Sequence, residues 1–236
     1  LVSKGKASLG NRFRIGAITN LAVNNYIEIH NTFISVLASE NDTTVNFSDF
    51  GPGVLPINSS TGNNPFSIVL NSGESYVIAV QGPHDPNRDG LIGALVTSDK
   101  PIALNCGSFG GSNAPGNLDL GFDQIVPAER INNNEYIFIK STGIDIVETV
   151  LLVADVDNTE VFLSGATTPA VILNAGSYAV FDGSSFDTNG NLYINTSQKV
   201  FAYQTIGDNS AVDQRNQEMF FVPPLSCQTP RIIDTI

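Results

Sequence analysis

The sequence predicts an all-β protein built as two tandem, internally repeated β-sandwich or jelly-roll-like modules. Three observations support this prediction. Apolar and polar residues alternate at a period of two, turn-forming residues separate short apolar runs, and a set of sequence blocks occurs twice in the same order. Each module is expected to hold roughly seven to nine strands, as sandwiches and jelly rolls do.

Half-buried strands are predicted where apolar and polar residues alternate, because successive side chains on a strand point to opposite faces. Such alternation occurs at residues 12–15, 26–30 and 45–47. Strands buried on both faces, or lying in the interior of a sandwich, are predicted where the run is apolar throughout and rich in β-branched or aromatic residues: 76–80, 91–96, 150–154 and 178–181. Turn signals lie between these runs, at 51–53, 72–73, 87–90 and 189–190. No stretch has the pattern of a capped amphipathic helix.

The internal repeat is carried by four pairs of blocks. TSDKPIALNCGSFGGSN (97–113) is echoed by TSQKVFAYQTIGDNS (196–210). The other pairs are 38–45 with 154–161, 69–73 with 172–176, and 125–127 with 221–223. Because all four keep the same order, we predict a first β-sandwich module at residues 1–131. The second module, at 132–236, would repeat it and end in an exit linker.

The balance of charge argues against two classes of partner. Acidic residues outnumber basic ones 23 to 11, so the net charge of the 236-residue chain is −12. Nucleic-acid binding needs clustered Lys and Arg, and no basic stripe is present. Anionic membrane surfaces are disfavoured for the same reason. No apolar run approaches the ~18 residues of a membrane span, and the first residues lack a signal-peptide core. We expect a segment of a longer multidomain chain, with no direct membrane insertion.

Catalytic chemistry is not predicted. The two histidines, His30 and His84, have no nucleophile set at a recognisable spacing, and no nucleophile-elbow sequence is present. Two His and two scattered Cys do not make a zinc ligand set. The Gly-rich stretch 106–113 lacks the Gly-Lys-Ser/Thr ending of a phosphate loop, so we interpret it as a wide β-loop.

Calcium is the only cofactor that the sequence suggests. Asp85, Asn87 and Asp89 stand at alternate positions before a glycine, as in the opening of an EF-hand loop. The glutamate expected at position twelve is missing. In the second module the matching place holds Asp187 and Asn189, again before a strand. The alternative is an Asx-type turn, in which side-chain oxygens accept hydrogen bonds from backbone amides.

The two cysteines, Cys106 and Cys227, are too far apart for a CxxC metal or redox motif. Either both are buried reduced thiols, or a disulfide joins the first module to the tail of the second. A bridge closing so long a loop could restrict the unfolded chain by ~4–5 kcal/mol in the entropy model.

Seven blocks together resemble the immunoglobulin-Fc-binding-protein N-terminal domain family. They are KPIALNCGSFGGSN, GFDQIVPAER, NEYIFIKSTG, VLLVADVDNTEVFLSG, LNAGSYAVFDG, KVFAYQTIG and MFFVPPLSC, and the resemblance covers about residues 10–227. The chain is most similar to the bacterial branch found in very large surface proteins of gliding bacteria. Those proteins often carry gliding-motility-associated C-terminal domains and leave by type IX secretion. Both cysteines lie inside family-like blocks, which favours the disulfide.

The resemblance implies a secreted or cell-surface module of the adhesion type, and it transfers no catalytic residue and no motif for Fc binding. We therefore expect a non-catalytic extracellular adhesion or binding module of a large bacterial cell-surface protein, with a protein or glycan on another surface as its partner. The alternative is a carbohydrate-binding module of an exported protein. The absence of Trp weakens that alternative, because such modules usually stack sugars on exposed aromatic rings.

Overall fold

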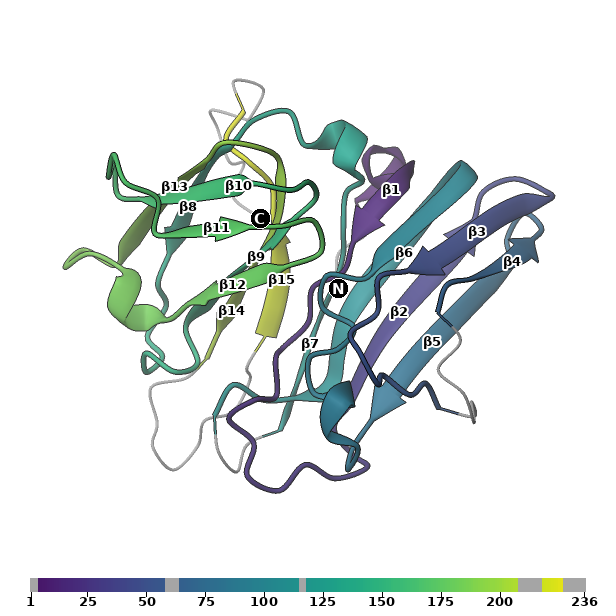
Figure 1. Cartoon of the computed structure of the whole chain (residues 1–236), viewed down its shortest axis with the longest axis horizontal. Helices are drawn as coiled ribbons and strands as arrows, with labels where there is room; N and C mark the ends of the chain where they lie inside the picture. Colours follow the sequence, from purple (N-terminus) through teal and green to yellow (C-terminus); the bar gives the residue numbers. More distant parts are fainter. Residues whose placement is uncertain (1–3, 58–63, 115–117, 208–217, 227–236) are drawn as a thin grey trace, which may run out of the picture.

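The computed structural model describes residues 4–57, 64–114, 118–207 and 218–226, and within them the protein is all-β, as predicted (Figure 1). All strand pairs are antiparallel, and four short 3₁₀ helices lie in connections: η1 (Gly5–Ser8), η2 (Asp85–Asn87), η3 (Ala128–Arg130) and η4 (Gly183–Ser185). No helix among the described residues is both long and apolar enough to cross a bilayer.

One long strand, β6 (Leu95–Gly111), organises the first half of the chain. Its first residues pair with β1 (Gly10–Arg14) and β3 (Thr43–Ser48), and its later residues pair with β2 (Asn31–Ala38) and β7 (Asp119–Gln124). Two outer strands complete the sheet, β4 (Phe66–Leu70) on β3 and β5 (Ser75–Gln81) on β2. The first part of β6 therefore belongs to the order β4-β3-β6-β1, and the last part to β5-β2-β6-β7.

The second half forms two four-stranded sheets. One has the order β11-β10-β13-β8 and the other β12-β9-β14-β15. Their bounds are β8 (Glu135–Ile139), β9 (Thr149–Ala154), β10 (Thr159–Leu163), β11 (Val171–Leu173), β12 (Tyr178–Phe181), β13 (Asn191–Thr196), β14 (Val200–Ile206) and β15 (Glu218–Val222). These two orders match those around the first and last parts of β6. In the second half the two parts are separate strands, β13 and β14, whereas in the first half they form the single strand β6.

Single hydrogen bonds also match between the halves. The amides of Ala38 and Ala154 donate to the carbonyl oxygens of Glu74 and Ser177, at 3.0 Å in both cases. The amides of Gly73 and Gly176 donate back to the carbonyl oxygens of Ala38 and Ala154, at 2.9 Å in both cases. Ala38, Gly73, Ala154 and Gly176 belong to blocks that the sequence repeats, and Glu74 and Ser177 directly follow two of these blocks. The division into modules 1–131 and 132–236 stays a prediction.

The sheet β12-β9-β14-β15 lies between two hydrophobic cores. One face carries Leu151, Val153, Phe201 and Tyr203, which pack with the core of the first half. The opposite face carries Val150, Leu152, Ala154, Val200 and Ala202, which pack against Tyr136 and Phe138 of β8. All six residues of β9 are buried, so the prediction for 150–154 is confirmed. The two halves share a core and are not joined by the linker alone.

Other predicted strands lie differently. Residues 76–80 and 178–181 belong to β5 and β12, which are edge strands, and Val77 is 56% exposed. In the run 91–96 only the last two residues are in a strand, because 91–94 form a buried turn before β6. Residues 26–30 are not a strand: the amide of His30 donates to the carbonyl of Ile27 at 2.9 Å, which closes a turn. The alternation there reflects a turn with Tyr26 and His30 buried.

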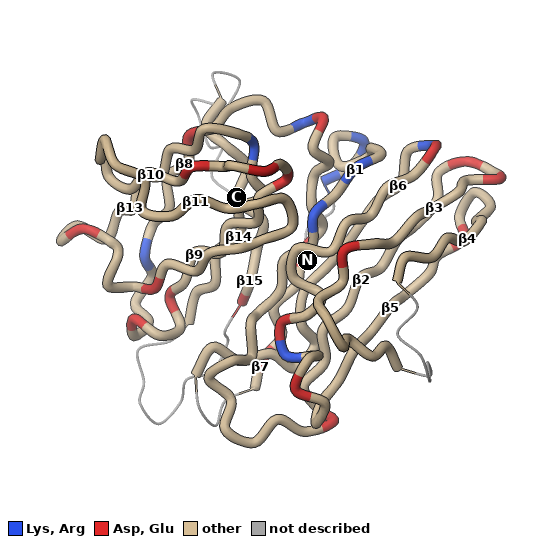
Figure 2. The backbone as a smooth tube through the Cα atoms, in the orientation of Figure 1, with Lys and Arg blue, Asp and Glu red and all other residues tan. Residues whose placement is uncertain are grey.

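The contact between the halves also contains polar and backbone groups. Arg14 is 2% exposed and donates to Asp49 at 2.6 Å, to Asp155 at 3.4 Å and to the carbonyl of Gly93 at 2.9 Å. The Tyr203 hydroxyl donates to the carbonyl of Arg14 at 2.7 Å. Figure 2 shows that Lys and Arg positions form no continuous stripe in the described part of the chain.

Substituting Gly93 should destabilise the protein through this contact. Gly93 has φ +87° and Gly73 has φ +83°, so alanine is strained at both by about 1–2 kcal/mol. Only at Gly93 would the added Cβ overlap another atom, the carbonyl oxygen of Gly176, whereas the space at Gly73 is open. Gly93→Ala should therefore lower the free energy of unfolding by ~1–3 kcal/mol more than Gly73→Ala in chemical denaturation. Equal losses of unfolding free energy in the two variants would mean that the close approach of the two halves at Gly93 contributes nothing to stability.

Candidate binding surface

Two edge strands from different halves, β7 and β15, lie side by side without forming a ladder (Figure 1). Asp123 of β7 links them and is 8% exposed. Its Oδ2 accepts a hydrogen bond from the Phe221 amide of β15 at 3.0 Å. The same oxygen forms an ion pair with Lys4 Nζ at 2.5 Å. Its Oδ1 accepts from the amide of Gln124 at 2.8 Å. One carboxylate thus joins both strands to the start of the chain.

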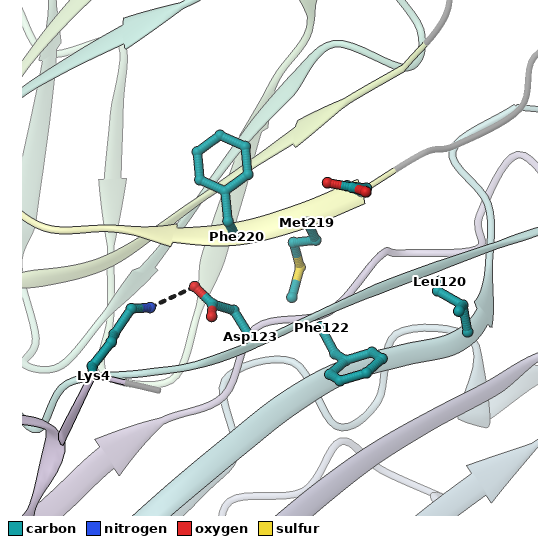
Figure 3. Close-up of a pocket in the computed structure, with 7 residues that line it drawn as sticks. Lys4, Leu120, Phe122, Asp123, Met219 and Phe220 are labelled. Atoms are coloured by element: carbon teal, nitrogen blue, oxygen red, sulfur yellow. Dashed lines mark hydrogen bonds and ion pairs between the residues drawn. The ribbon is translucent and has the colours of Figure 1, made fainter. Parts of the chain in front are cut away.

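Next to this link the two strands border a groove of about 370 Å³. The Lys4–Asp123 pair lies at one side and Leu120 at the other (Figure 3). Its remaining lining is Phe122, Glu218, Met219 and Phe220. The groove is therefore mainly apolar, with an exposed carboxylate at Glu218.

An aromatic cluster continues the groove onto the outward face of the sheet. The ring centroids of Phe33 and Phe109 are 4.8 Å apart, those of Phe109 and Phe122 are 5.2 Å apart, and those of Phe33 and Phe122 are 5.5 Å apart. Phe33 is 6% exposed, whereas Phe109 is 56% exposed. Phe33 and Phe122 therefore support a ring that is open to solvent.

Further apolar side chains surround the cluster. Leu120 is 50% exposed, Leu118 is 43% exposed and Ile29 is 56% exposed. A Cβ built on Gly110 would meet both the Ile29 carbonyl and the Leu118 side chain, which places these two residues together. We call the set Ile29, Phe33, Phe109, Leu118, Leu120 and Phe122 the aromatic patch. Contiguous exposed apolar surface of this kind commonly marks an interaction site.

The sequence does not predict the aromatic patch, because the glycine-rich pattern of residues 106–113 is typical of a loop. Residues 106–111 instead continue β6. Gly107, with φ +144°, and Gly110 leave no room for a Cβ against Phe122 and Ile29, so these glycines allow close packing within and beside a strand. The alternation of Leu118, Leu120 and Phe122 was the available signal. It predicts one apolar face but not whether that face is covered.

The first group of calcium candidates is occupied by contacts within the protein. Asp85 is paired with Arg88 at 3.0 Å. Asn87 is 2% exposed, and its amide bonds the backbone N–H of Leu55 at 2.8 Å and two backbone carbonyls. Asp89 Oδ2 accepts from the Tyr178 hydroxyl at 2.5 Å. Asp85, Asn87 and Asp89 thus each contact a different set of partners within the protein.

The second group forms an Asx-type turn. Oδ1 of Asp187 accepts from the amides of Asn189 at 2.8 Å and Asn191 at 2.9 Å. Among the described residues, no three His, Cys, Asp or Glu side chains gather as a metal site would require. Calcium binding stays a prediction.

Cys106 lies in the first core and is completely buried, with its Sγ 3.8 Å from the Tyr203 hydroxyl. Burial raises the pKa of its thiol to about 11. Cys227 lies outside the described residues, so the pairing of the two cysteines stays a prediction.

Alkylation tests the predicted disulfide. In the native protein Cys106 should not react at pH 8 in either case, because it is bridged or its thiol is buried and protonated. In denaturant without reductant a bridged pair should take up no alkyl group, and mass spectrometry should find two only after reduction. Two adducts on the unreduced, denatured chain would exclude the bridge.

Chelation tests the calcium hypothesis. If either loop binds the ion in the native state, adding calcium to chelator-treated protein should raise the Tm. At a calcium concentration of a hundred times the Kd, the free energy of unfolding should rise by ~2.7 kcal/mol. Magnesium at the same concentration is the control for a general salt effect. An unchanged Tm would remove all five candidates, Asp85, Asn87, Asp89, Asp187 and Asn189, as calcium ligands.

Comparison with known proteins gives one result that covers nearly the whole chain. The model of a family described as IgGFc binding protein matches residues 1–234. No curated protein and no solved structure matched the chain. Because the family model spans both halves and the contact between them, the chain belongs to the IgGFc binding protein family.

Proposed function

We propose that the chain is a non-catalytic adhesion module of a large bacterial cell-surface protein, and that it contacts a partner protein through the aromatic patch. The observation that carries the proposal is the half-exposed ring of Phe109, held up by Phe33 and Phe122 and flanked by Leu118 and Leu120. Aromatic side chains in such a position are the usual anchors of protein interfaces. Membership of a binding-protein family supports the same function.

An extracellular location and export by type IX secretion are part of this proposal. They follow from the resemblance of the repeated blocks to large surface proteins of gliding bacteria. The longer chain would carry the module outward and present it to another surface. The family description makes the Fc part of immunoglobulin G one ligand to test, although no short motif in the chain marks that activity.

A glycan is the second candidate ligand, because Phe109 is an exposed aromatic ring on a sheet face. Two features favour a protein. The rings of the cluster are inclined to one another by 32–67°, so they form no flat platform for a sugar chain. The flanking surface at Ile29, Leu118 and Leu120 is aliphatic and offers no hydrogen bonds to hydroxyl groups.

Binding measurements on an aromatic-patch variant test the proposed function. The purified chain is applied to immobilised Fc, extracellular matrix proteins, intact bacterial cells and a glycan array. In the double variant Phe109→Ser with Leu120→Ser, affinity for the protein or cell ligand should fall by about tenfold or more, because anchors of this kind each contribute roughly 2 kcal/mol. Since both side chains are at least half exposed, the Tm should change little.

The matched control is Ile172→Ser on β11, which is also 56% exposed but lies on another sheet. It should bind as the parent protein does. Equal binding by the patch variant and the control would exclude the aromatic patch as the contact surface. Tight binding to the glycan array alone would replace the adhesion proposal with the carbohydrate-binding alternative.

A further inference from the structure

A second cavity, of about 480 Å³, lies between the halves and shares no lining residue with the aromatic patch. It is lined by two loops of the first half, around residues 51–52 and 86–92, and by residues 176–178, where the second half enters β12. Its walls are Gly, Pro and Ile, with Asp89, Ser177 and Tyr178 as the polar side chains. The volume is within the range of ligand pockets, and its location between two units of structure is a common one for such sites.

Asp89 is the only charged side chain of this cavity lining. Its Oδ2 accepts a hydrogen bond from the Tyr178 hydroxyl at 2.5 Å. Burial, together with the hydrogen bond to Asp89, raises the pKa of Tyr178, so this hydroxyl stays protonated and remains a donor at neutral pH. The Tyr178 hydroxyl therefore orients this carboxylate through a hydrogen bond from a neutral group and brings no positive charge to it.

The nearby cations are engaged elsewhere. Arg88 donates to Asp85 and to the carbonyl oxygens of Asn20 and Val23, and its guanidinium stacks over Tyr26 at 4.6 Å. Arg14 is held by Asp49, Asp155 and the Gly93 carbonyl, as described above. Within the described residues no Lys or Arg forms an ion pair with Asp89.

We propose that this cavity binds a cationic side chain, arginine or lysine, of a partner protein. The cation would pair with Asp89, while the Tyr178 ring and the Pro and Gly walls would contact its aliphatic part. One carboxylate provides too few oxygen ligands for calcium, which takes six to eight. The net charge of −12 favours the approach of a basic partner. The inference rests on the proposed function and adds the chemistry of the partner.

Short peptides provide the direct test. Acetyl-Gly-Arg-Gly-amide is titrated into the isotope-labelled chain and followed by NMR, with the neutral isostere citrulline in place of arginine as the matched ligand. Amide shifts should occur around residues 51–52, 86–92 and 176–178 with arginine and with a lysine peptide. The citrulline peptide lacks the positive charge, so its affinity should be lower than that of the arginine peptide by about tenfold or more.

Three variants locate the interaction. Asp89→Asn keeps an oxygen for the Tyr178 hydroxyl and should weaken arginine binding by about tenfold. Tyr178→Phe keeps the ring, frees the carboxylate and should retain binding. Asp85→Asn removes an 80% exposed carboxylate in the same loop and should have no effect. Equal binding of arginine and citrulline, no binding of either, or equal losses in Asp85→Asn and Asp89→Asn would each overturn the proposal.

The two proposals fail in different experiments. If the arginine peptide does not bind but the aromatic-patch variant still loses adhesion, the cation pocket is wrong and the proposed function stands. If the peptide binds at Asp89 while no protein, cell or glycan ligand is retained by the chain, the adhesion function fails. The cation site is then a property of the fold alone.

Discussion

The burial of one sheet on both faces is the constraint on which the rest of this structure depends. β9 and β14 alternate between two cores, with Val150 and Leu152 facing one way and Leu151 and Val153 the other. The central strands of such a sheet are largely apolar on both faces, and their neighbours must fit them closely. Gly16 meets this demand, because any side chain there would overlap the Tyr203 ring. The halves are thereby fixed relative to each other, since sliding one over the other would expose these side chains to water.

Both candidate sites lie at borders of this shared core. The groove forms where β7 and β15 meet, and the cation pocket forms where β12 begins next to the loops of the first half. Neither border is closed by regular strand pairing, so side chains and loop backbone define both spaces. The contact between the two halves thus yields recesses that either half alone would lack.

The fold class and the positions of several strands follow from the sequence, because alternation and repetition are local or block-wise signals. β3 and β9 were predictable in this way. The edge positions of β5 and β12 were not predictable. Residues 76–80 and 178–181 are as apolar as 150–154, and the sequence of one segment does not show whether that strand has a neighbour on both sides. The turn at residues 26–30 shows the same limit, since a sequence that alternates like a strand here forms a turn that buries only its two ends, Tyr26 and His30. The aromatic patch depends on three rings from β2, β6 and β7 meeting across the sheet, so no single segment encodes it.

Asp123 also bears on how such modules behave when many copies are crowded together. The open side of an edge strand is a template for another chain, and an unpaired amide there invites intermolecular sheet growth. The carboxylate of Asp123 accepts the hydrogen bond of the Phe221 amide. This amide is therefore not free to pair with a strand of another chain at the edge of β15. The charge placed between the two edges also makes insertion of an apolar strand costly. The same residue that joins the halves therefore guards against aggregation through these edges.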